Sequence, residues 1–186
     1  MMRTDYLEKL TALLRAEKWD AMLLCPSEEL RFFAGFSPLM CERFQGLFLK
    51  QDGRMFYFCN LLTGEEVRAA APDAFPVYTW FDNDIMTEEI CRIFEKEGLT
   101  GGRIAVNSTA QAFNILDIAV ATGTRFENGV PLLEQARICK TQQELDCLRR
   151  AAAIADQGFL HTLPHIRPGM TEGEIHDILV QEMEAL

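Results

Sequence analysis

The sequence contains no apolar run that approaches the roughly 18 residues of a membrane-spanning helix. Residues 1–20, MMRTDYLEKLTALLRAEKWD, mix acidic with apolar side chains at helical spacing, whereas a signal peptide has a continuous apolar stretch after a basic start. We therefore expect a cytoplasmic protein that has no membrane partner.

Clusters of basic side chains are missing as well. The chain holds 18 Lys and Arg against 28 Asp and Glu, which gives a formal net charge of −10. A field of this sign repels a phosphate backbone, and no local run of Lys and Arg overrides it. The charge balance argues against a nucleic-acid partner.

The chain has six cysteines but no C-x-x-C pair. Cys25 and Cys59 lie in the strand-like runs AMLLC and MFYFC, where a reduced cysteine behaves as a small hydrophobic residue. The chain is large and shows no secretory signal, which are not the features of a disulfide-dependent domain. We predict free thiols.

Sequence signatures of nucleophilic catalysis are also absent. Ser27, Ser37 and Ser108 have no G-x-S-x-G setting, and the cysteines have no basic partner in a recognisable motif. Gly101-Gly102 precedes a strand-like run instead of following one, so a phosphate-binding loop is not expected there. We predict no catalytic and no cofactor-binding residue in this chain.

Two groups of residues could be metal ligands, but the spacing of neither matches a metal-binding motif. His161 and His165 are four residues apart, as ligands on one helical face can be, but Pro164 lies between them and no third ligand follows. A second candidate, a calcium loop, has Thr where the sixth position requires Gly, and an acid-rich helix start explains its carboxylates better. The carboxylates of this second candidate are Asp82, Asp84, Glu88 and Glu89. We predict no metal ligand.

Strand-like and helical patterns alternate through the first part of the chain. Short β-branched or aromatic runs predict strands over 21–25, 44–50, 55–59, 75–80, 103–107 and 124–128. Apolar residues at helical spacing predict helices over 5–18, 61–71, 84–97 and 108–120, the last one capped by Ser108. Residues 28–36 indicate a short helix or a turn, closed by Gly35. Asp52-Gly53 between two strand-like runs predicts a hairpin. The sum is an α/β fold with a mixed β-sheet flanked by helices.

This α/β domain is expected to span 1–133, where Val130-Pro131-Leu132-Leu133 begins a connector. Residues 134–186 differ, because they carry helical stripes over 141–160 and 175–186 on either side of a turn at Pro168-Gly169. Thr171-x-x-Glu174 is a capping box that starts the second helix. Two amphipathic helices need a surface to pack on, so we expect an incomplete second domain.

Two segments carry a resemblance to a known family. Arg137-Ile138-Cys139-Lys140-Thr141-Gln142-Gln143-Glu144-Leu145 resembles the junction of Xaa-Pro dipeptidases, aminopeptidases P and creatinases. Ile166-Arg167-Pro168-Gly169-Met170-Thr171-Glu172-Gly173-Glu174-Ile175 resembles the turn and second helix that follow in this family. Trp19-Asp20-Ala21-Met22-Leu23-Leu24 is similar to the family's first strand.

The resemblance implies a creatinase-type N-terminal domain followed by the first two helices of a pita-bread catalytic domain. Relatives hydrolyse the bond before proline with two divalent metal ions, commonly manganese or cobalt. Their ligands, which are two Asp, one His and two Glu, lie after the second helix, so no residue here corresponds to them. The intact parent is then a metallopeptidase acting on proline-containing peptides, and this chain alone is expected to be inactive.

In such an enzyme the N-terminal domain contributes to a homodimer and shapes the substrate entrance. Two alternatives stay open. The chain could be a stand-alone binding or oligomerisation module without enzymatic activity, or the front part of a creatinase-like amidinohydrolase.

Overall fold

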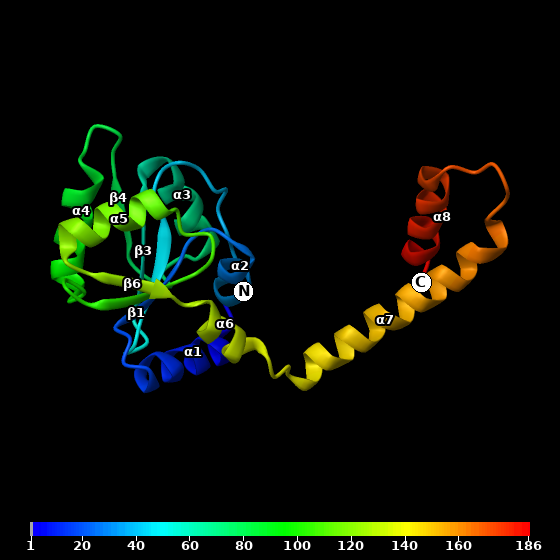
Figure 1. Ribbon diagram of the computed structural model, residues 1–186, viewed down its shortest axis with the longest axis horizontal. Helices are drawn as coiled ribbons and strands as arrows, with labels where there is room; N and C mark the ends of the chain where they lie inside the picture. Colours follow the sequence, from blue (N-terminus) through cyan, green and yellow to red (C-terminus); the bar gives the residue numbers. More distant parts are fainter. Residues whose placement is uncertain (1) are drawn as a thin grey trace. The chain divides into compact units, whose positions relative to one another are not determined.

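The structure is a computed structural model that describes residues 2–186 and divides into two compact units, Met1–Ile138 and Cys139–Leu186 (Figure 1). The first unit alternates helices and strands. Its elements are α1 (Thr4–Ala16), β1 (Ala21–Leu24), α2 (Glu28–Ala34), β2 (Gly46–Lys50), β3 (Met55–Asn60), α3 (Leu61–Ala70), β4 (Val77–Trp80), α4 (Met86–Glu97), β5 (Arg103–Val106), α5 (Ala112–Thr122), β6 (Arg125–Asn128) and α6 (Val130–Arg137).

The strands form one six-stranded sheet in the order β4-β3-β2-β1-β5-β6. Strand β2 is antiparallel to both β1 and β3, while the pairs β1–β5, β3–β4 and β5–β6 are parallel. The carboxyl ends of all strands except β2 therefore meet at one edge of the sheet, which we call the carboxyl edge. The expected mixed sheet flanked by helices is confirmed.

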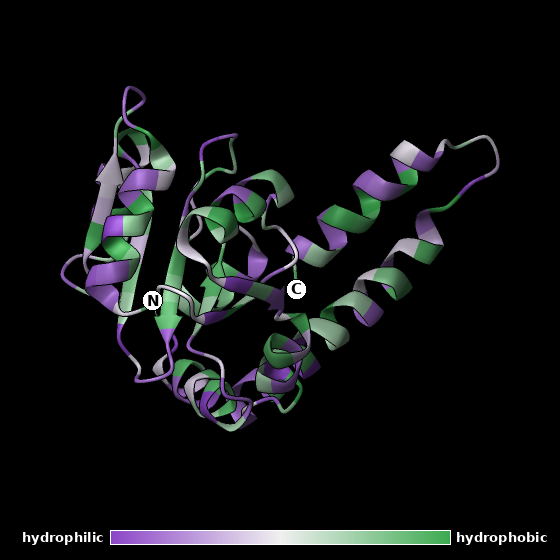
Figure 2. Cartoon of the chain, turned by 60° about the vertical axis from the view of Figure 1, so that its left-hand side comes forward, coloured by the Kyte–Doolittle hydropathy of each residue, from purple (hydrophilic) through white to green (hydrophobic). Residues whose placement is uncertain are grey.

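Both faces of the central strands β1, β2 and β3 are buried, which explains the unbroken apolar runs in these strands. On β1, Met22 and Leu24 belong to the core beneath α1, α2, α3 and α6, whereas Ala21 and Leu23 belong to the core beneath α4 and α5. Figure 2 shows the hydrophobic colour concentrated on the strands, with hydrophilic and hydrophobic residues mixed on the helices.

The β2–β3 hairpin forms where Asp52-Gly53 predicts it. Gly53 has φ +88°, a conformation that residues with a side chain rarely adopt. Asp52 accepts a hydrogen bond from the backbone N–H of Arg54 at 3.0 Å, which closes the turn.

The predicted cap at Ser108 is wrong. Residues 107–110 form a turn in which the N–H of Ala110 donates to the carbonyl of Asn107 at 3.4 Å, and the hydroxyl of Thr109 is bonded to the Asn107 side chain. Helix α5 consequently begins at Ala112, with Gln111 at its cap.

The connector predicted from Val130 is also wrong, because Val130–Arg137 is helix α6. Pro131 lies in its first turn, where a missing N–H costs no helical hydrogen bond. Leu132, Leu133 and Ala136 are buried in the core that α1 covers. This helix belongs to the first compact unit, which therefore extends beyond residue 133.

The second unit is a helical hairpin of α7 (Gln142–Thr162), the 3-10 turn η1 (Leu163–His165) and α8 (Glu172–Glu184). The capping box of Thr171 and Glu174 is confirmed, and Thr141 with Glu144 forms another at the start of α7. In residues 2–186 no helix has both the length and the apolar character needed to cross a membrane.

Candidate functional site

The carboxyl edge of the first unit concentrates its polar interactions on Asn107, the residue that follows β5. Its Oδ1 accepts from the N–H of Cys25 at 3.0 Å, and its Nδ2 donates to the Cys25 carbonyl at 3.1 Å. The same Nδ2 lies 2.9 Å from the hydroxyl of Ser27 and 3.0 Å from that of Thr109. Asn107 is 3% exposed, so this side chain ties the loops after β1 and β5 together inside the protein.

A segment without helix or strand, 36–45, lies across this edge before β2. The side-chain amide of Gln45 donates to the Leu39 carbonyl at 3.0 Å, and Gln111 donates to the Cys41 carbonyl at 3.1 Å. The hydroxyl of Tyr57 donates to Oε1 of Gln45 at 3.2 Å. The segment is thus held by hydrogen bonds from α5, β3 and its own end.

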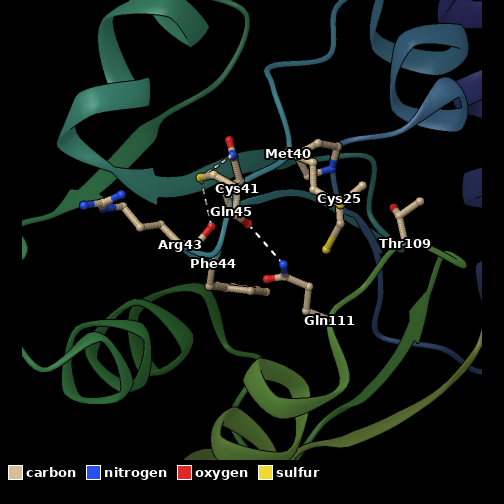
Figure 3. A pocket seen from close by; sticks show the side chains of 9 residues that line it. Cys25, Met40, Cys41, Arg43, Phe44, Gln45, Thr109 and Gln111 are labelled. Atoms are coloured by element: carbon tan, nitrogen blue, oxygen red, sulfur yellow. Dashed lines mark hydrogen bonds between the residues drawn. The ribbon is translucent and has the colours of Figure 1, made fainter.

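A small hollow lies under this segment (Figure 3). Its volume is about 10 Å³, which is close to the space of one water molecule. Phe44, Cys25 and Gln111 are among the side chains that line it. The carboxyl edge, where α/β proteins commonly bind ligands, is therefore closed here by the protein's own chain.

Burial lowers the reactivity of the thiols of Cys25 and Cys59. Desolvation raises the pKa of the Cys25 thiol to about 12. Desolvation also raises the pKa of the Cys59 thiol to about 12, although the charge of Arg68 acts in the opposite direction. The thiolate is the nucleophilic form, so neither side chain is an activated nucleophile at neutral pH. All six cysteines are free in the structure.

Arg43 in segment 36–45 forms a two-point ion pair with Asp82, which follows β4. Nε and Nη2 donate to the two carboxylate oxygens at 2.8 and 3.0 Å, and Nδ2 of Asn60 adds a bond to Asp82 at 2.9 Å. The hydrogen bond from Arg43, together with its charge, holds the pKa of Asp82 below the usual range. These bonds connect segment 36–45, the loop after β4 and the junction of β3 with α3.

Exposed apolar side chains lie near Arg43, Asn60 and Asp82 in the sequence. Leu39 is 86% exposed, Leu62 is 73% exposed and Phe81 is 51% exposed. Leu39 lies in segment 36–45 with Arg43, Leu62 lies in the first turn of α3 after Asn60, and Phe81 directly precedes Asp82. We call the following set the carboxyl-edge patch: Leu39, Met40, Leu61, Leu62, Phe81 and Ile85.

The histidines considered as metal ligands do approach one carboxylate. His161 Nδ1 lies 3.4 Å from Oε2 of Glu182, and His165 Nε2 lies 3.8 Å from its other oxygen. These contacts are loose ion pairs on the α7–α8 hairpin between side chains that are partly exposed to solvent.

The carboxylates considered for calcium do not converge either. Asp82 is engaged with Arg43, Asp84 accepts from the N–H of Phe81 at 2.7 Å, and Glu88 and Glu89 both pair with Arg92. Within residues 2–186 no group of three or more His, Cys, Asp or Glu side chains is arranged to hold a metal ion. The described residues therefore do not fit a dinuclear metal centre.

Asn107 and Arg43 are the site residues that the sequence patterns did not single out. Asn107 binds Cys25, and Arg43 binds Asp82, and both partners are distant in the sequence. An Asn directly after the strand RIAV was the one available signal for the first of them.

Comparison with known proteins follows the same division of the chain. The family model described as the creatinase/prolidase N-terminal domain matches residues 7–139. An uncharacterized peptidase of Staphylococcus aureus (strain MSSA476) is 23% identical over 179 residues, which cover 92% of this chain and 47% of that protein. The chain thus spans about half the length of the curated relatives it matches.

Solved structures share the fold. The dipeptidase PepE from Mycobacterium ulcerans superposes with a TM-score of 0.84 at 23% identity, over 97% of this chain and 48% of that one. An Xaa-Pro dipeptidase from Bacillus anthracis gives a TM-score of 0.72 at 22% identity, over 98% of this chain and 49% of that one.

Proposed function

Because the chain belongs to the creatinase/prolidase N-terminal domain family, we propose that it is the non-catalytic N-terminal portion of an Xaa-Pro dipeptidase-like metallopeptidase. The observation that carries this proposal is the match over residues 7–139 together with relatives that are about twice as long. An Xaa-Pro dipeptidase among the structural neighbours favours proline-containing peptides as the substrates of the longer protein.

In this proposal the two divalent metal ions of the intact enzyme are bound outside the described residues. No step of bond hydrolysis is assigned to side chains of this chain. The second unit, Cys139–Leu186, is the beginning of the catalytic domain, whose remainder covers the exposed apolar side chains of α7 and α8. Leu148, Phe159 and Leu160 of α7 are each more than half exposed, which supports a covering partner.

The first unit contributes to dimerisation and to the wall of the substrate entrance. The carboxyl-edge patch supports this role, because its exposed apolar side chains lie on segment 36–45, the start of α3 and the loop after β4, which Arg43, Asn60 and Asp82 connect. A surface that is both apolar and fixed suits contact with another protein surface or with a peptide.

Hydrolysis of Gly-Pro in the presence of manganese tests the proposal. The chain is expected to release no proline above the blank. Activity above the blank that persists after His161→Ala and His165→Ala substitution contradicts it, since it would require a catalytic centre within this chain.

A further inference from the structure

A hollow on the opposite side of the first unit from the carboxyl edge has no role in the proposed function. It lies between α1 and the β2–β3 hairpin, and its volume is about 400 Å³. Binding pockets for small molecules generally fall between roughly 300 and 1,000 Å³. The hollow therefore has the size of a ligand site.

Its floor is apolar. Leu7 of α1 and Leu49 of β2 are buried there, and Met55 of β3 and Met2 are partly buried beside them. Thr11 satisfies its own hydroxyl by donating to the Leu7 carbonyl at 2.7 Å, so it adds no open polar group to the floor. Such a floor suits an aliphatic side chain of a ligand.

Two opposite charges stand at the rim on one face of α1. Arg15 donates from Nε to the Gln51 carbonyl at 2.7 Å, which fixes its guanidinium beside the hairpin. Within residues 2–186, neither Nη atom of Arg15 nor the carboxylate of Glu8 has a hydrogen bond or ion pair. Asp52, also at the rim, is occupied by Arg54 at 2.8 Å.

The positions of these two residues on α1 indicate the length of the ligand. Glu8 and Arg15 are separated along the helix axis by about 10 Å, from the rise of about 1.5 Å per residue. An extended peptide of three residues spans roughly 10 Å between its termini. Its ammonium group matches Glu8, and its carboxylate matches the free edge of the Arg15 guanidinium that the two Nη atoms form.

We propose that this hollow, lined by Glu8, Thr11, Arg15, Leu49 and Met55, binds a short peptide that has free termini and an aliphatic central side chain. A phosphate or a fatty acid carries negative charge alone and meets the carboxylates of Glu8 and Asp52, which disfavours it. The site belongs to this chain and requires no catalytic domain, so it goes beyond the proposed function.

The test is titration of the 186-residue chain with Ala-Leu-Ala, followed by NMR of the backbone amides and by calorimetry. The expected result is shifts confined to residues around Thr11, Leu49 and Gly53. Amidation of the peptide's carboxylate, or Arg15→Gln in the protein, weakens binding by about tenfold, and combining the two adds little. Acetylation of the peptide's amine, or Glu8→Gln in the protein, should likewise weaken binding by about tenfold, and combining these two changes should add little.

Arg92→Gln and Glu65→Gln, which change matched charges on other helices, leave the affinity unchanged. The tryptophan emission of each variant confirms that the first unit is folded. The proposal is overturned if Ala-Leu-Ala causes no shift at these amides up to roughly 10 mM. It is also overturned if the amidated peptide binds the unsubstituted chain as tightly as Ala-Leu-Ala does, or if the Arg15→Gln variant binds Ala-Leu-Ala as tightly as the unsubstituted chain does.

Discussion

The side chain of Asn107 binds both backbone groups of Cys25, accepting from its N–H at 3.0 Å and donating to its carbonyl at 3.1 Å. The two residues follow β1 and β5, so the amide continues the pairing of these parallel strands beyond their last backbone bonds. This bridge fixes the loops on which the carboxyl edge is built.

Removal of the bridge should destabilise the first unit. Asn107→Ala leaves the buried N–H and carbonyl of Cys25 without their partner, and we expect the free energy of unfolding to fall by about 2–3 kcal/mol. Urea unfolding followed by tryptophan fluorescence measures this, because Trp19 and Trp80 both lie in the first unit. The neighbouring exposed residue provides the control, since Ser108→Ala should change stability by less than about 0.5 kcal/mol.

The Arg43–Asp82 pair predicts a pH dependence. Because folding lowers the pKa of Asp82, the pair stabilises the fold above the carboxyl's ordinary pKa, and the contribution is lost as pH falls through the lowered value. Arg43→Gln should raise the pKa of Asp82 toward its ordinary value and remove this acid sensitivity. Carbon NMR titration of the Asp82 carboxyl measures the shift. An unchanged titration in Arg43→Gln, or an equal change in Arg92→Gln, would refute the assignment.

Alanine substitution at Gly158 and at Gly173 should change the stability of the α7–α8 hairpin in opposite directions. A Cβ at Gly158 would lie 2.5 Å from Cγ of Met183, whereas a Cβ at Gly173 meets nothing closer than 3.9 Å. We expect Gly158→Ala to destabilise the α7–α8 hairpin by about 1–3 kcal/mol despite the better helix propensity of alanine. Gly173→Ala should stabilise it by up to about 1 kcal/mol.

Amide hydrogen exchange near Thr162, a buried residue of α7, reports on this hairpin. Met183→Ala combined with Gly158→Ala should restore part of the loss, because it removes the atom that the new methyl group meets. Equal protection in both glycine variants would show that the helices do not pack as closely as the structure has them.

The carboxyl-edge patch predicts self-association. Leu62→Ser replaces a side chain that is 73% exposed, so it should leave the unfolding free energy nearly unchanged while weakening dimer formation by about tenfold. Sedimentation velocity over a range of concentrations measures the dimer constant. Val120→Ser, at an 87% exposed position on α5 outside the patch, is the matched control and should have no effect.

The fold could be predicted from sequence wherever the signal was local. The hairpin at Asp52-Gly53 and the capping box at Thr171 follow from turn and cap chemistry within a few residues. Helix α6 was missed because Val130-Pro131-Leu132-Leu133 was interpreted as the start of a connector, although proline is compatible with the first turn of a helix.

The site residues that were missed share a different cause. Asn107 and Cys25 are 82 positions apart, and Arg43 and Asp82 are 39 positions apart. Such partners become neighbours through the order of strands in the sheet, which no local pattern encodes. The hollow beside α1 was missed for the same reason, since its walls come from α1 and from a hairpin far along the chain.

If this chain is the non-catalytic front of a prolidase-like enzyme, as we propose, its coding sequence continues beyond codon 186, and sequencing the source gene is the decisive experiment. We expect an open reading frame in which two Asp, one His and two Glu follow in the order of the metal ligands of the family. A stop codon directly after the codon for Leu186 would contradict it and would favour a stand-alone binding module.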